Sequence, residues 1–238
     1  MNYVDKVFHN ICSRELVPIY GFKRYRNTYY RIINDVFQSF NLHKSVSRDN
    51  CTVEFTLRPL CTDVLITKGT CGSDHLKIFR GTYDWFYYDN TPLSIEACFE
   101  EIYKYINDYL IGYFERGNNC ANAYNEVLSF HRNFFSVDAV IHLNELYYFA
   151  LKSEMYDEAI EHLLAIKNAT IRAFERNKLF IKGNNLDDMK QRTANELLDY
   201  DNMISHISKR NTEYIYNLIS YNERKNLHSL GIKTSFML

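Results

Sequence analysis

The last proline of the chain, Pro92, divides the sequence into two halves of different texture. After it, apolar residues recur at steps of three and four with no further proline, which predicts helices up to the C-terminus. Thr91 can cap the first of these helices, and Pro92 suits its first turn. From Gly21 to Pro92 the chain instead consists of short β-branched and aromatic runs between turn residues, which is typical of antiparallel strands. The sequence therefore predicts an α+β fold.

The N-terminal half should combine one helix with a sheet. Residues 3–20 place their apolar side chains at mostly helical spacing, and this helix should end before Pro18 or at Gly21. We expect four or five antiparallel strands within residues 22–33, 36–43, 52–59, 63–66 and 75–86. The first helix should cover one face of the sheet.

We predict two parts without a flexible linker. The α+β antiparallel-sheet domain should span residues 1–90, and a helical domain of four or five helices should span residues 91–238. The absence of a Gly/Ser/Pro-rich linker indicates that the two parts pack together, or form one continuous domain.

A seven-residue repeat runs through the last part of the chain. It consists of Leu197, Ile204, Asn211 and Leu218 and, offset by three, of Tyr200, Ile207, Tyr214 and Tyr221. Unbroken, this helix would be about 60 Å long. One interpretation is a helix, bent or broken once, that packs on the chain's own bundle; Leu198 and Ile215 widen its stripe and favour this. The other is an exposed arm for a homodimer or a partner helix, with Asn211 setting the register.

Charge and composition set limits on partners and compartment. The 28 Lys and Arg against 29 Asp and Glu leave no global field that would favour nucleic acid or an anionic membrane. No run reaches the ~18–20 apolar residues of a membrane span, and Asp5 and Lys6 stand where a signal peptide would need its apolar segment. The six cysteines form no C-x-x-C pair. We expect a cytoplasmic protein with free thiols and no membrane partner.

One local patch could support charge-driven binding. Residues 21–48 hold cations interleaved with tyrosines: Lys23, Arg24, Tyr25, Arg26, Tyr29, Tyr30, Arg31, Lys44 and Arg48. A sheet that presents cations and rings is suited to single-stranded nucleic acid, because bases stack on rings while phosphates meet cations. The alternative is a solvated sheet face whose rings point into the core, which the alternation of strand side chains favours.

Motifs for metal binding or catalysis are weak. The nearest groupings are Cys61 with Cys71 and His75, His142 with Glu145, and Glu158 with His162. The first holds only one closely spaced ligand pair, and the others are not Glu-x-x-His units. The chain has no G-x-S-x-G elbow and no phosphate-binding glycine loop. We predict no metal, no cofactor and no enzyme activity.

The N-terminal half carries three short motifs in succession. They are PIYGFKRYRNTYYR at 18–31, NDVFQSFNLHKS at 34–45 and VEFTL at 53–57. Together with YDW at 83–85, they resemble an uncharacterised bacterial family, a domain of unknown function, over about residues 1–130. His43 stands where that family commonly has Gln. The resemblance implies a compact α+β module of bacteria or their phages, with no established activity and no catalytic residues to carry over.

Three classes of function follow from these observations. The first is a non-enzymatic protein-interaction module, of which toxin neutralisation is a form suggested by analogy; Tyr25, Tyr29, Tyr30 and the long C-terminal helix would be its contacts. The second is a nucleic-acid-binding protein that uses the patch in residues 21–48. The third, an enzyme built between sheet and helices, has no motif in its support.

Overall fold

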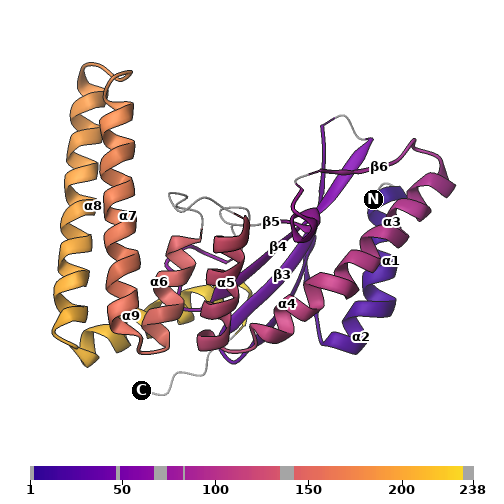
Figure 1. Ribbon diagram of the computed structural model, residues 1–238, viewed down its shortest axis with the longest axis horizontal. Coiled ribbons are helices and arrows are strands. Elements are labelled where there is room, and N and C mark those ends of the chain that lie inside the picture. The colour runs from indigo at the N-terminus through magenta and orange to yellow at the C-terminus, as the bar shows by residue number, and fades with distance from the viewer. Residues whose placement is uncertain (1–2, 47–48, 67–73, 83, 135–141, 233–238) are drawn as a thin grey trace.

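The computed structural model describes residues 3–46, 49–66, 74–82, 84–134 and 142–232, and its fold is α+β as predicted (Figure 1). The strands are β1 (Lys23–Tyr25), β2 (Thr28–Ile33), β3 (Val36–Lys44), β4 (Asn50–Pro59), β5 (Asp74–His75) and β6 (Phe86–Tyr87). The helices are α1 (Tyr3–Ile11), α2 (Val17–Tyr20), α3 (Pro92–Tyr105), α4 (Ile111–Arg116), α5 (Cys120–Phe134), α6 (Leu143–Lys152), α7 (Tyr156–Asn177), α8 (Asn184–Ser208) and α9 (Thr212–Ser229). Wider π-helical turns, Cys12–Leu16 and Ile106–Leu110, join α1 to α2 and α3 to α4, and a 3₁₀ turn spans Leu76–Arg80.

The first helical segment runs from Tyr3 to Tyr20, as its spacing predicts. It ends because Gly21 takes a left-handed conformation with φ 71°, from which its N–H donates to the carbonyl of Val17. Phe8 and Leu16 are among the apolar side chains that this segment buries. The amphipathic helix therefore begins the core against which the sheet packs.

The sheet is antiparallel, with strand order β1-β2-β3-β4-β5 and β6 beside β4. Asn34 and Asp35, both at positive φ, form the tight turn between β2 and β3, which pairs Ile33 with Val36. Tyr29 then lies opposite Phe40, and Phe40 opposite Phe55, so their rings share one face. Phe8 of α1 packs edge-on against the rings of Tyr29 and Phe40, with centroids 5.9 and 6.4 Å away. The first helix thus covers one face, as predicted.

Three of the predicted strand boundaries are wrong. The run 22–33 is interrupted by a turn in which Arg26 has φ 55°, so it forms two strands. Residues 63–66 are not a strand, because the Ile66 N–H donates to the side chain of Asn226, which also binds the carbonyls of Leu60 and Thr62. The run 75–86 pairs only at its ends, in β5 and β6.

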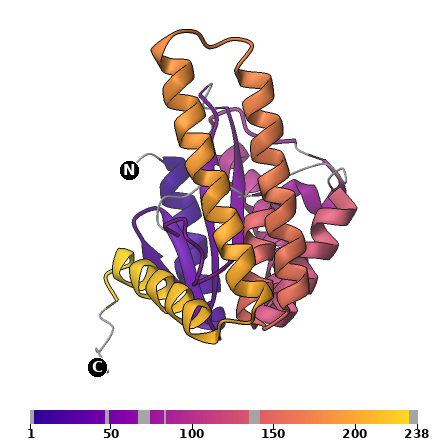
Figure 2. The ribbon, with the colours of Figure 1, turned by 90° about the vertical axis from the view of Figure 1, so that its left-hand side faces the viewer.

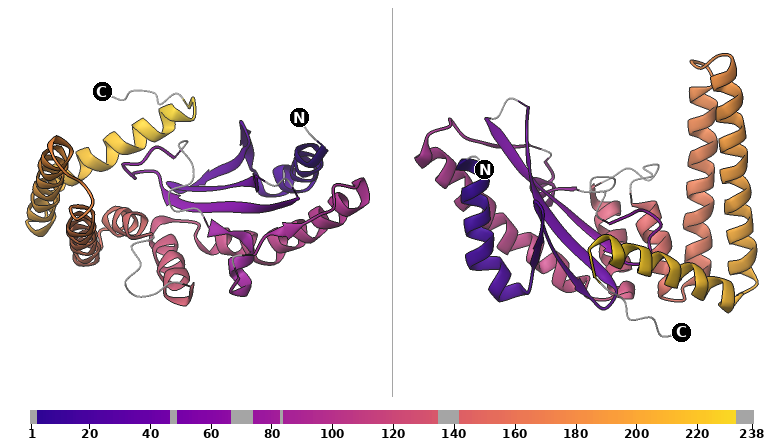
Figure 3. Two further views of the ribbon diagram at one scale, coloured as in Figure 1. Left: turned by 90° about the horizontal axis from the view of Figure 1, so that it is seen from above. Right: turned by 180° about the vertical axis from the view of Figure 1, so that it is seen from behind.

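The second face of the sheet is partly covered by α9, which lies on the opposite side from α4 and α5 (Figure 3). Here a smaller apolar cluster forms between the sheet and the end of the chain. Its buried members are Tyr30, Phe37, Leu60, Ile66 and Leu230. The main buried apolar cluster continues without a break from Val4 to Ile215, so both halves of the chain contribute to one core.

The long C-terminal helix of the sequence analysis is two helices. The chain turns after Ser208, Arg210 takes φ 49°, and Asn211 caps α9 by accepting a 3.1 Å hydrogen bond from the Tyr214 N–H. Figure 2 shows α8 beside α7 as an antiparallel hairpin, with α9 leading away from the base of α8. The interpretation as a helix broken once is confirmed, and the continuous arm is wrong.

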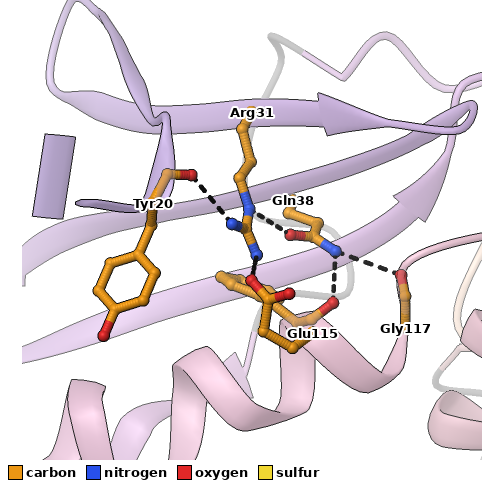
Figure 4. Close-up of polar contacts among 6 residues, drawn as sticks. Tyr20, Arg31, Gln38, Glu115 and Gly117 are labelled. Carbon is orange, nitrogen blue, oxygen red and sulfur yellow. Dashed lines mark hydrogen bonds and ion pairs between the residues drawn. The ribbon is translucent and has the colours of Figure 1, made fainter. Parts of the chain in front are cut away.

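A buried arginine joins the sheet to two helix ends (Figure 4). Arg31 of β2 donates to the Gln38 Oε1 at 2.7 Å, to the Tyr20 carbonyl at 2.9 Å and to the Glu115 carboxylate at 2.7 Å. Gln38 in turn donates to the carbonyls of Phe114 and Gly117. The guanidinium also lies 4.8 Å from the Phe22 ring centroid. Each of its three nitrogens therefore donates a hydrogen bond within the chain.

None of the helices in the described part of the chain is both long enough and apolar enough to cross a membrane.

We expect Arg31→Met to lower the free energy of unfolding by about 2–4 kcal/mol, because it leaves buried acceptors of Gln38 and Tyr20 without a donor. Arg31→Lys should cost nearly as much, since one ammonium cannot reproduce the planar fork. Urea denaturation measures both. The exposed Arg26→Met is the control and should stay within about 0.5 kcal/mol of the parent; an equally small effect of Arg31→Met would contradict the role given to this network.

Candidate functional site

The structure buries three of the nine residues of the predicted binding patch. Tyr29 is fully buried, and Tyr30 and Arg31 are 8% and 7% exposed. Tyr29 packs against α1, Tyr30 stacks on Phe37, and Arg31 belongs to the network just described. These three residues therefore do not belong to a contact surface. The alternation of strand side chains turns Tyr29 and Arg31 toward the core, and the apolar cluster under α9 covers Tyr30.

The cations of the patch do not form a continuous strip. Arg24 places its Nη2 3.0 Å from the His9 Nε2, and Lys44 pairs with Asp5 at 2.7 Å. The exposed Lys23 and Arg26 lie at the hairpin of β1 and β2, where the Arg26 guanidinium is 5.3 Å from the Tyr25 ring centroid. Arg48 lies outside the described residues. Of the predicted binding surface, a small basic corner of Lys23, Tyr25 and Arg26 remains.

Most of the seven-residue repeat contributes to the protein's own packing. Ile207 is buried, Asn211 caps α9, and Tyr221 is 63% exposed. The partly buried members that pack against the core are Tyr200, Ile204, Tyr214 and Leu218. Leu197 lies on α8 and is partly buried. Pairing of this repeat with a second chain stays a prediction, and it would have to use its exposed residues, such as Tyr221.

Most residues of the groupings that were weighed for a metal site have other partners. His142 lies 3.1 Å from Asp74, and Glu145 pairs with Arg58 at 3.0 Å. Burial lowers the pKa of His142, but the hydrogen bond to Asp74 and its charge outweigh burial and raise that pKa. The His162 Nε2 lies 3.1 Å from the Tyr124 hydroxyl oxygen. Cys71 lies outside the described residues, and within them no group of three His, Cys, Asp or Glu is arranged to hold a metal ion.

A polar cluster that was not predicted from the sequence lies on the face of the sheet that α1 does not cover. We call it the Glu54 cluster; its members are Asn41, His43, Glu54, His75 and Trp85. The Asn41 amide donates to the Glu54 Oε2 at 3.3 Å, while the His43 Nδ1 and the His75 Nε2 lie 3.4 and 4.0 Å from the Oε1. Pairing of β3 with β4 and of β4 with β5 sets Asn41 and His75 on either side of Glu54.

An indole ring packs against both imidazoles of the cluster. The Trp85 ring centroid lies 5.4 Å from that of His43 and 5.5 Å from that of His75. The Glu54 side chain is 9% exposed, whereas that of His43 is 46% exposed and forms the outer rim. Burial lowers the pKa of His75, which favours its neutral form at pH 7. The cluster is therefore a nearly buried carboxylate beside a neutral imidazole and an indole.

Part of the cluster has a sequence signal. Alternation along residues 36–43 and 52–59 sets Asn41, His43 and Glu54 on one face. The positions of His75 and Trp85 depend on two-residue strands that no periodicity marks.

Comparison with protein-family models, curated proteins and solved structures gave no match to this chain. The resemblance of the N-terminal half to an uncharacterised bacterial family therefore stays a prediction.

We expect the fluorescence of Trp85, the sole tryptophan of the chain, to fall as the pH is lowered, because a protonated imidazole quenches an adjacent indole. The part due to His75 should have its midpoint below about 6.5, the ordinary histidine pKa. The pKa of His75 is lower in the folded than in the unfolded chain. His75 therefore does not change the free energy of unfolding above about pH 6.5, and it lowers that free energy as the pH falls through the folded pKa.

A fluorescence titration from pH 8 to pH 5 on the parent and on His75→Gln isolates this part. His228→Gln, at an exposed histidine of α9, is the control and should leave the curve unchanged. A His75 component centred above the ordinary histidine pKa would contradict the burial argument.

Proposed function

We propose that the chain is a non-enzymatic protein-interaction module of the cytosol and that it binds its partner through the hairpin of α7 and α8. The observation that carries the proposal is the exposure of two large apolar side chains where the helices join. Leu179 is 71% and Phe180 81% exposed. We call residues 178–183 the hairpin tip; it lies at the far end of the hairpin from the rest of the chain (Figure 1).

Within the described residues, the fully buried side chains of the hairpin lie at its base. The buried residues of α7 are Ala159 and Leu163, in its first turns, and the buried residue of α8 is Ile207, in its last turn. An ion pair of 2.5 Å between Lys167 and Asp201 links the two helices farther out. The tip is thus carried on two joined helices and can enter a partner's surface without hindrance from the sheet.

The chemistry of the tip indicates the kind of partner. Arg176, Lys178 and Lys182 flank the two apolar side chains, and Lys178 is paired with Glu175. A convex apolar knob with a basic rim complements a pocket with an acidic rim. Aromatic anchors of this kind, seated in a partner's pocket, commonly supply most of the binding energy.

Toxin neutralisation is a narrower form of this proposal, since a pre-organised helical hairpin can occupy a partner's active-site pocket at little conformational cost. Nucleic-acid binding is the alternative function. Its support has shrunk to the corner formed by Lys23, Tyr25 and Arg26, because Arg31 is buried and Lys44 is paired with Asp5.

Affinity purification from native cells tests the proposal. We expect a stoichiometric protein to accompany the parent chain and to be lost from the double variant Leu179→Ser, Phe180→Ser, whose melting temperature should be unchanged because both side chains are exposed. Leu198→Ser is the matched control: Leu198 is 60% exposed on the same hairpin, away from the tip, and its replacement should leave the partner bound.

Two results would overturn the assignment. If the double variant keeps the partner, the tip is not the contact. If the bound species raises the 260/280 nm absorbance ratio and is removed by nuclease and by salt, the protein binds nucleic acid instead.

A further inference from the structure

We infer that the Glu54 cluster is a binding site for an organic cation of the guanidinium or ammonium class. The inference is independent of the proposed function, because the cluster lies on the sheet and the hairpin tip on α7 and α8.

The charge of the cluster is the first feature that favours a cationic ligand. Glu54 is nearly buried, yet its neighbours in the described chain are an amide and two imidazoles, with no guanidinium or ammonium among its ion pairs. The equally buried Glu145 has Arg58 at 3.0 Å, and Glu223, 20% exposed, has Lys152 at 2.6 Å. A buried carboxylate without a cation is costly. An external cation would supply at Glu54 what Arg58 supplies at Glu145.

Two lysines of neighbouring elements in the described chain have other partners. Lys44 of β3 pairs with Asp5 at 2.7 Å. Lys77 donates to the Trp85 carbonyl at 3.0 Å, and its ammonium lies 4.4 Å from the Phe86 ring centroid. Neither of these two ammonium groups reaches the Glu54 carboxylate in the structure.

The rings of Trp85, His43 and His75 are the second feature that favours a cationic ligand. The ring centroids of Trp85 and the two imidazoles lie within 6.5 Å of one another, and both imidazoles approach the Glu54 carboxylate. Cations bind over indole faces at up to about 6 Å from the ring centroid, and most strongly where water is excluded. A carboxylate also accepts two parallel hydrogen bonds from the planar guanidinium fork.

Access to the carboxylate is from the side of His43. Its side chain is 46% exposed, whereas that of His75 is 24% exposed. Because the described residues hold no group of three arranged to coordinate a metal, an organic cation suits the site better than a metal ion.

The single tryptophan makes the site directly observable. Fluorescence of the full chain is titrated with argininamide up to about 10 mM, a range that covers weak millimolar sites. We expect a saturable change with argininamide and none with citrullinamide, its uncharged isostere. Glu54→Gln should weaken binding by roughly tenfold or more, the effect of losing one charge-assisted interaction. Glu101→Gln, at an exposed carboxylate of α3, should leave it unchanged.

Further arms keep the test decisive. If Glu54→Gln lowers the melting temperature, Trp85→Phe replaces it, and saturation-transfer NMR on argininamide follows binding; affinity should again fall. A Gly-Arg-Gly peptide that binds more tightly than argininamide would assign the cation to a polypeptide, and equal affinity to a free small molecule. Equal responses to argininamide and citrullinamide, no saturation, or saturation by Zn²⁺ alone would overturn the inference.

Discussion

The buried guanidinium of Arg31 is the constraint on which the arrangement of this protein depends. It joins β2 to the end of α2 through the Tyr20 carbonyl and to α4 through Glu115, while Gln38 binds the carbonyls at the end of α4. A charge buried in this way must find its partners in place, so strand register and helix position are fixed together. Gly117, whose carbonyl accepts from Gln38, follows α4 closely against β4. A Cβ at this position would lie 2.7 Å from a methyl group of Leu57, so a larger residue would force the Leu57 side chain to move.

The two faces of the sheet have different physical roles. One face is aromatic and packs against helices: Tyr29 stacks on Phe40, and Phe55 stacks on Phe79. The other face is apolar beneath α9 and polar around Glu54. Among the described residues, Glu54 is buried beside two imidazoles and has no guanidinium or ammonium partner, unlike Glu145, which pairs with Arg58. Residues that depart from the packing logic of their surroundings in this way are candidates for function.

The C-terminal helices show how packing changes the meaning of a sequence repeat. The seven-residue spacing leaves open both a continuous arm and a helix broken once, and the structure has Ile207 and Ile215 buried in the main cluster on either side of a break. The turn at Asn211 therefore interrupts the helix, and apolar residues on both sides of it are buried. The outer half of the hairpin of α7 and α8 extends away from the sheet.

The sequence by itself determined the α+β class, the first helix, the Asn34–Asp35 turn and the helical second half, because periodicity, capping and turn chemistry are local properties. The tertiary structure alone decided that Arg31 is buried and Arg26 exposed, that residues 63–66 bond to Asn226 instead of a strand, and that His75 and Trp85 meet at Glu54. These outcomes depend on contacts between segments far apart in the chain, whose energies no local pattern encodes. The sites proposed above belong to this second kind: Phe180 is notable only because nothing in the described chain covers it.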